Sequence, residues 1–129
     1  MKKTINIIFK ILLVLLLISP ILGVFGIMPA PTRDLYNTDQ AFTFIEILMN
    51  TGYVMWMMAV VFLLSIILIF KNKMAAVALL ILPITLNIVG FHAFVDGGLL
   101  TSGAIMGNIL LVINLYYLWQ NRAVYKALF

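Results

Sequence analysis

The amino-acid sequence predicts an all-α membrane protein, with four transmembrane helices packed as a bundle in one domain, residues 1–129. Of its residues, 65% are apolar and only 9% are charged, whereas about 25% of the residues of a soluble domain are charged. The apolar residues also form four runs, each long enough to cross a bilayer. A water-soluble fold would lack the polar residues needed to cover such a core.

The first span is expected over residues 5–28, with the Lys10 ammonium group reaching the interface. Basic residues followed by an apolar run also fit a secretory signal peptide. The run is long for that role, and the candidate cleavage point after Ala30 has Met28 where a small residue is required. A retained helix is therefore predicted. It should kink at Pro20, because proline lacks a backbone N–H.

A polar, proline-containing stretch then predicts a loop outside the hydrocarbon. Asp39 is a candidate N-cap for the segment that follows. This segment is expected to run without a break into the second span, over residues 47–70. Tyr53 and Trp56 lie in the outer half of that span, where amphipathic rings suit the headgroup region.

Residues 71–73 form a link so short that the second and third spans must be antiparallel neighbours. The third span is expected over residues 74–95, with a kink at Pro83, and the fourth over residues 99–119. The fourth ends in a predicted aromatic belt made of Tyr116, Tyr117 and Trp119.

The basic residues predict the orientation of the bundle. With four spans, both termini share one side with the turn at residues 71–73, and seven of the eight basic residues fall there. Only Arg33 lies on the other side. Because basic loops stay in the cytoplasm, both termini are predicted to be cytoplasmic. The cytoplasmic (inner) membrane of a bacterium is a separate expectation. The acidic residues Asp34, Asp39, Glu46 and Asp96 all fall on or near the outer side.

The composition excludes several kinds of chemistry. The chain has no cysteine and one histidine, so it cannot form a disulfide, a thiolate or His-rich metal site, or a bis-histidine haem site within one chain. It has no Gly-rich phosphate loop and no serine-nucleophile motif. The lysines are explained by topology, so the lipid bilayer rather than nucleic acid is the expected partner. No catalytic residue and no metal ligand is assigned.

Polar residues near the outer end of the third span are the main site candidates. His92 and Asp96 lie four residues apart on one helical face, which suits a proton-handling or ligand-binding pair. The alternative is a helix-end histidine bonded to a neighbouring loop, at the interface where polar groups cost little. Glu46 and Tyr53 share a face of the second span and would complete a polar pocket if the two faces meet. Otherwise Glu46 is simply solvated ahead of the span.

Deeper polar and small residues are candidates for helix packing. Asn87 and Asn108 lie at similar depths in the third and fourth spans, so they are expected to bond to each other, or alternatively to a ligand. Asn114 has the same two interpretations. Gly103 and Gly107 form a G-x-x-x-G pattern that lets another backbone approach closely. That backbone is either within the chain or in a homo-oligomer or partner subunit.

Several stretches together carry a family resemblance: Val24-Phe25-Gly26, Gly52-Tyr53, Pro83 with Asn87-Ile88, Phe91-His92-Ala93-Phe94-Val95-Asp96, and the ending Tyr117-Leu118-Trp119. They cover most of the chain, which resembles the DoxX-like family of small four-helix membrane proteins. The resemblance implies a four-helix bundle. It also implies a link to quinol-oxidising and other respiratory or sulfur-redox complexes, or to proteins that assist other membrane proteins.

Two departures from the family pattern bear on function. The family often has a glutamate in the second span followed four residues later by glycine, and those places are Phe62 and Ile66 here. It also often has a lysine shortly after the first-helix Phe-Gly, whereas Gly26 here leads into Ile27-Met28-Pro29. If those charged groups carry proton or quinone chemistry, this chain has lost it.

The sequence therefore predicts a non-catalytic accessory or assembly subunit of a membrane complex. The alternative is a quinone-linked redox protein or a lipophilic-ligand-binding protein with an outer polar pocket. Quinone is the cofactor that this alternative implies. The candidate ligand-binding residues are Glu46, Tyr53, Asn87, His92 and Asp96. A transporter is a weaker third option, because four helices without an internal repeat leave little room for alternating access.

Overall fold

The computed structural model describes residues 1–129 and contains only helices. In chain order these are α1 (Lys2–Val24), η1 (Arg33–Leu35), α2 (Asp39–Thr51), α3 (Tyr53–Phe70), α4 (Met74–Phe94), η2 (Ser102–Ala104), α5 (Ile105–Gln120) and α6 (Arg122–Lys126). Four segments are long and apolar enough to cross a membrane: α1, α3, α4 and the run from η2 through α5. The predicted all-α class with four long apolar helices is confirmed.

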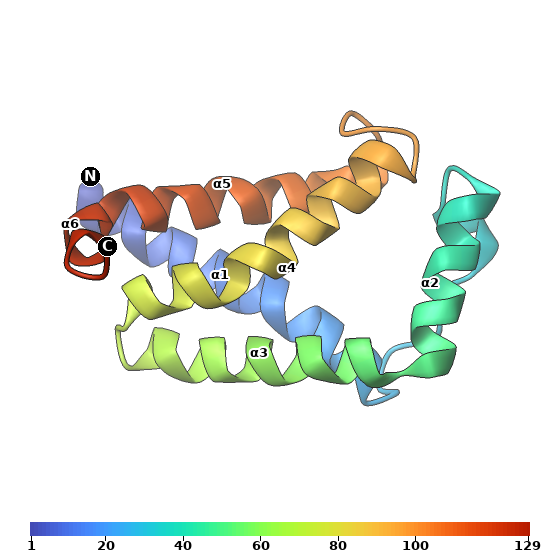
Figure 1. Ribbon diagram of the computed structural model, residues 1–129, viewed down its shortest axis with the longest axis horizontal. Helices are drawn as coiled ribbons and strands as arrows, with labels where there is room; N and C mark the ends of the chain where they lie inside the picture. Colours follow the sequence, from blue (N-terminus) through green and yellow to red (C-terminus); the bar gives the residue numbers. More distant parts are fainter.

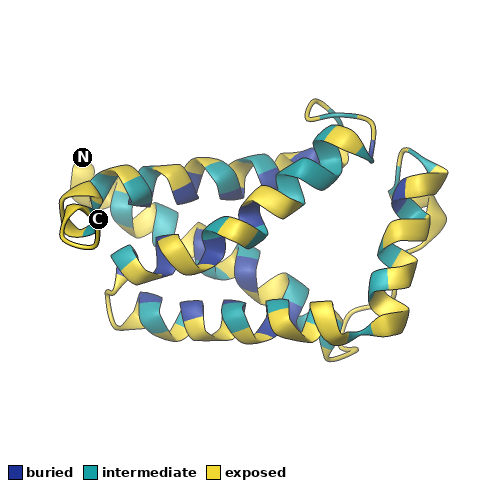
Figure 2. Ribbon diagram, viewed as in Figure 1, coloured by how far each residue is buried: buried dark blue, intermediate teal, exposed yellow.

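These four segments pack as a bundle (Figure 1). Helix α4 packs against both α3 and α5, and α1 packs mainly against α3. The core is a cluster of 13 buried apolar residues, whose largest fully buried members include Phe62, Leu13, Leu17 and Tyr117. Buried residues lie on the faces that the helices turn toward one another, and exposed residues cover the outward faces (Figure 2). Because the outward faces are themselves apolar, they are suited to contact with lipid.

Both termini lie at the same end of the bundle as the α3–α4 turn (Figure 1). Here the Tyr117 hydroxyl donates to Asn6 Oδ1 at 2.7 Å, and the Tyr125 hydroxyl donates to the Ala75 carbonyl at 2.8 Å. These bonds tie α5 to α1 and α6 to α4. Tyr117 is buried, so its assignment to an interfacial aromatic belt is corrected: the ring packs inside the bundle.

Gly52 divides the predicted second span into two helices. Its φ of +78° favours glycine, and it both ends α2 and precedes the first residue of α3. Helix α3 therefore begins at Tyr53 rather than at Ile47, and α2 turns away across the end of the bundle opposite the termini (Figure 1). This corrects the expectation that Glu46 and Tyr53 share a helical face, because they belong to helices with different directions.

Of the asparagines expected to bond between helices, Asn114 is the one that links α4 to α5. Asn114 is fully buried, and its Nδ2 donates to the Ala78 carbonyl at 2.9 Å. The expected bond between Asn87 and Asn108 does not form, because Asn108 Nδ2 donates instead to the Leu99 carbonyl at 2.8 Å. The polar link between these helices therefore lies closer to the termini than predicted.

Candidate ligand cavity

A cavity of about 670 Å³ lies between α2, α3 and α4 at the end opposite the termini. Helices α3 and α4 are close at their short turn and separate toward α2, which stands across the gap (Figure 1). Of the 19 residues that line the cavity, 14 are hydrophobic. A mostly apolar site with few polar groups, in a volume between about 300 and 1,000 Å³, is typical of small-molecule binding sites.

The α3 and α4 walls of the cavity continue into the lipid-facing surface of the bundle. Val54 and Met57 on α3 and Leu80 on α4 line the cavity and are also exposed. On helices that span a membrane, exposed apolar side chains contact lipid. A lipophilic molecule dissolved in the bilayer would therefore meet the cavity from the side. Two further methionines, Met55 and Met58, make this lining adaptable in shape.

His92 and Asp96 form the polar end of the cavity. Their side chains project from the last turn of α4 and the residues just after it, where i and i+4 positions share a face. His92 Nδ1 lies 3.4 Å from Asp96 Oδ2, and the two side chains are only 14% and 1% exposed. Neither atom has a hydrogen-bond partner. Buried polar atoms in proteins normally have partners, so this pair is a candidate contact for a ligand.

The other carboxylate oxygen of Asp96 fastens the loop before α2. Its Oδ1 accepts from the backbone N–H of Asn37 at 2.7 Å, and the Asn37 Nδ2 donates to the Asp96 carbonyl at 3.0 Å. The next residue, Thr38, donates from its hydroxyl to the Val95 carbonyl at 2.7 Å, and the same hydroxyl oxygen accepts from the Ala41 N–H. Thr38 is thus the N-cap of α2, which corrects the assignment of that role to Asp39. These bonds hold α2 over the cavity.

Three aromatic rings stand beside the polar pair in the cavity lining. Phe44 from α2 stacks with Phe91 from α4 at 5.8 Å between centroids, and Tyr36 meets Phe91 edge to face at 6.3 Å. The His92 ring is 5.1 Å from that of Phe91. No lysine or arginine lines the cavity, and Asp96 is its one acidic residue.

Gly103 and Gly107 both face the polar pair from the start of the fourth span. A Cβ added to Gly103 would lie 3.7 Å from both Asp96 Oδ2 and His92 Cε1, and Gly103 itself lines the cavity. A Cβ added to Gly107 would lie 3.0 Å from Ile88 Cγ2. The G-x-x-x-G pattern is therefore used within the chain, against α4.

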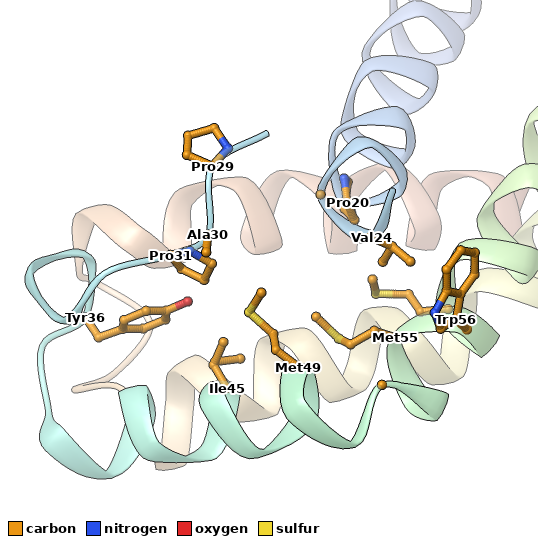
Figure 3. A pocket seen from close by; sticks show the side chains of 13 residues that line it. Pro20, Val24, Pro29, Ala30, Pro31, Tyr36, Ile45, Met49, Met55 and Trp56 are labelled. Carbon is orange, nitrogen blue, oxygen red and sulfur yellow. The ribbon is translucent and has the colours of Figure 1, made fainter. Parts of the chain in front are cut away.

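Tyr36 separates this cavity from a smaller one of about 300 Å³. Tyr36, Ile45, Met55 and Met58 line both spaces and so form the partition. In Figure 3 the Tyr36 hydroxyl points into the smaller cavity, near Pro31, while its ring faces Phe91 in the larger one. Burial raises the pKa of Tyr36 above its usual value, and the negative charge of Asp96 raises it further.

The structure brings together three of the five predicted ligand-binding residues. Asn87, His92 and Asp96 line the large cavity, and Asn87 lies about 7.5 Å from His92 along α4, on the side of the α3–α4 turn. Glu46 and Tyr53 are exposed and line neither cavity. Sequence reasoning missed the aromatic rings and the loop that hold the polar end: Tyr36, Asn37, Phe44 and Phe91. The Tyr36–Thr38 stretch before α2 contains Thr38, a residue type that favours helix N-caps. The sequence gives no sign of its contact with Asp96, because that contact joins positions 59 residues apart.

No protein-family model, curated protein or solved structure matches this chain. Its four long apolar helices make it a multi-pass membrane protein by length and hydropathy. Membership in the DoxX-like family stays a prediction.

Proposed function

We propose that the protein binds a lipophilic small molecule in the cavity between α2, α3 and α4, and that the molecule enters from the bilayer. The observation that carries the proposal is one space of about 670 Å³ with an apolar wall on α3 and α4 and two unpartnered polar atoms at one end. From Leu80 to His92 the lining extends about 18 Å along α4 at 1.5 Å per residue. That length suits an apolar tail with a polar head.

The competing prediction, a non-catalytic accessory or assembly subunit, loses one of its supports. It relied in part on the G-x-x-x-G surface as a contact for another chain, and Gly107 instead packs against Ile88 of the same chain. A partner subunit or a homo-oligomer would have to use another lipid-facing surface. A ligand-binding role is compatible with membership in the DoxX-like family and with a location in the cytoplasmic membrane of a bacterium. We also infer this membership and this location, from the sequence resemblance and the basic residues.

The proposal is tested by saturable binding to the purified full-length chain in lipid nanodiscs. Decyl-ubiquinone and dodecanol serve as probes, because they differ in head group but both carry an apolar chain. Leu80→Trp should abolish saturable binding, because the larger ring fills the cavity. Leu79→Trp is the matched control, since both leucines are 38% exposed and only Leu80 lines the cavity.

Saturable binding of either probe that is lost in Leu80→Trp and kept in Leu79→Trp supports the proposal. Binding that both tryptophan variants reduce equally would show a general effect on the bundle and contradict it. Binding of decyl-ubiquinone alone, with no binding of dodecanol, would favour the quinone-linked alternative.

A further inference from the structure

The carboxylate of Asp96 is a buried acidic group at the polar end of the cavity, whose lining holds no lysine or arginine. Asp96 is 1% exposed, and its Oδ2 has no hydrogen-bond partner. His92 Nδ1 lies 3.4 Å from that oxygen but forms no hydrogen bond with it. The one basic residue of the preceding loop, Arg33, is occupied by Asp39 at 2.6 Å. A buried carboxylate with one unsatisfied oxygen is costly, so this site favours a ligand that supplies positive charge.

The rings beside Asp96 are placed to favour the same kind of ligand. Tyr36, Phe44 and Phe91 line the cavity together with the carboxylate. Aromatic faces within about 6 Å attract ammonium groups through the negative face of the ring, most strongly where water is excluded. An anionic head would meet Asp96 with no lysine or arginine in the lining to offset the repulsion.

We propose that the polar end of the cavity binds an ammonium group carried on an apolar body. Asp96 Oδ2 is the anionic contact, and the neighbouring aromatic rings surround the cation. The apolar body lies along α4 toward Leu80, among the methionines of α3. This inference rests on the proposed function, and it names the class of ligand.

Gly103 leaves the room that the ammonium group needs. A methyl group there would stand 3.7 Å from both Asp96 Oδ2 and His92 Cε1, which is ordinary van der Waals contact. Gly103→Ala should therefore fold normally while filling the space next to the carboxylate. Gly90→Ala is a matched control, because a Cβ at Gly90 meets nothing within 4 Å and Gly90 does not line the cavity.

The test compares four amphiphiles with one chain length in nanodiscs that hold the full-length protein: dodecyltrimethylammonium, dodecylphosphocholine, dodecanol and dodecyl sulfate. We expect dodecyltrimethylammonium to bind at least 10-fold more tightly than dodecanol, and dodecyl sulfate to bind more weakly than dodecanol. Dodecylphosphocholine distinguishes the source of the ammonium group. Affinity equal to that of dodecyltrimethylammonium assigns it to a phospholipid headgroup, and weaker affinity assigns it to a free lipophilic amine.

Two variants test whether the preference for the cation over dodecanol depends on the Asp96 carboxylate and on the space beside it. Asp96→Asn keeps an oxygen that can accept from the Asn37 N–H but removes the charge, so the preference for the cation over dodecanol should disappear. Gly103→Ala should weaken the cation at least 10-fold, and Gly90→Ala should leave its affinity unchanged. If Asp96→Asn does not fold, the Gly103→Ala result decides alone.

The possible failures are distinguishable. Equal affinity for all four heads in the wild-type protein would overturn the cation assignment and leave the lipophilic-ligand function standing. A preference for dodecyltrimethylammonium that survives in both Asp96→Asn and Gly103→Ala would place the cation elsewhere and also overturn the assignment. No saturable binding of any probe would overturn both proposals.

Discussion

Asp96 Oδ1 accepts a hydrogen bond from the backbone N–H of Asn37 at 2.7 Å, across 59 residues of sequence. The bond joins the end of α4 to the loop before α2. The Asn37 side-chain amide and the Thr38 hydroxyl add two further hydrogen bonds at the same junction. Because α2 forms one wall of the cavity, the position of that wall depends on this junction.

Replacing Asp96 should therefore destabilise the protein in a way that depends on the substitute. Asp96→Ala leaves the Asn37 N–H without its acceptor, and we expect the free energy of unfolding to fall by about 1–3 kcal/mol. Asp96→Asn keeps an acceptor oxygen and should cost less. Unfolding in mixed detergent–SDS micelles measures both.

Asn37→Ala is the matched control for this junction. It removes the bond from Asn37 Nδ2 to the Asp96 carbonyl but keeps the backbone N–H, so it should cost about 0.5–1.5 kcal/mol. Equal stability of Asp96→Ala and the wild type would contradict a structural role for the carboxylate.

Gly107 packs so closely on Ile88 that an added methyl group must displace it. The Cβ of Gly107→Ala would lie 3.0 Å from Ile88 Cγ2, and overpacking of this kind costs about 1–3 kcal/mol. Gly90→Ala, which adds the same methyl group to open space, should be neutral or slightly stabilising. In the double variant Gly107→Ala/Ile88→Ala, the loss in unfolding free energy should be smaller than the sum of the losses in the two single variants. A double variant that is only additively worse would show that the two side chains do not compete.

The two contacts of Asp96, with His92 and with Asn37, show what the sequence can predict about this fold and what it cannot. The i, i+4 pair His92 and Asp96 was predictable, because helical geometry alone places them together. The Asn37–Asp96 bond was not, because it joins distant segments and depends on how α2 turns. That turn is set by the positive φ of Gly52, and an apolar stretch that contains glycine can equally continue as one helix. The cavity therefore lacks the predicted residues Glu46 and Tyr53, and its lining includes aromatic residues that were not predicted.

Asn114 is the polar side chain that links α4 and α5 inside the bundle. Its Nδ2 bond to the Ala78 carbonyl is fully buried, and such bonds in membranes contribute about 0.6 kcal/mol on average. Asn114→Ala should lower stability by at least that amount, because it also removes packed atoms. Asn108→Ala should cost less, since Asn108 is only partly buried and bonds to the nearby Leu99 carbonyl. Unfolding of the two variants in the same micelles checks the order, and the reverse order would contradict this assignment.

Tyr36 makes the stability of the protein sensitive to alkaline pH. Burial first, and the Asp96 charge second, raise the pKa of Tyr36 in the folded chain above the usual value of 10.0. Above that pH the unfolded chain loses the proton while the folded chain still holds it. Stability from this group is thus fully present below pH 10 and is lost as pH rises through the folded pKa.

The measurement is the difference in unfolding free energy between wild type and Tyr36→Phe as pH is raised. The wild type should lose more stability than the variant above pH 10.0. Comparing the two cancels the contributions of the other tyrosines. In Asp96→Asn the pKa of Tyr36 should fall only part of the way back, because burial remains. Identical pH profiles for wild type and Tyr36→Phe would contradict the assignment.

The end of the bundle that carries α2 and the cavity is predicted to face away from the cytoplasm. Seven of the eight basic residues lie on the side of the termini and the α3–α4 turn, and basic segments resist translocation. The chain has no cysteine, so single cysteines report topology without background. In intact cells, a membrane-impermeant maleimide should label Leu100→Cys, a fully exposed position in the loop after α4, and should leave Lys71→Cys unlabelled.

Permeabilising the cells should expose Lys71→Cys as well, because the α3–α4 turn is also exposed. Ile67→Cys on the lipid-facing surface of α3 is the negative control and should stay unlabelled in both conditions, because hydrocarbon keeps its thiol from ionising. Labelling of Lys71→Cys but not Leu100→Cys in intact cells would invert the orientation. The cavity would then open toward the cytoplasmic half of the bilayer, and its ligand would have to reach it from that leaflet.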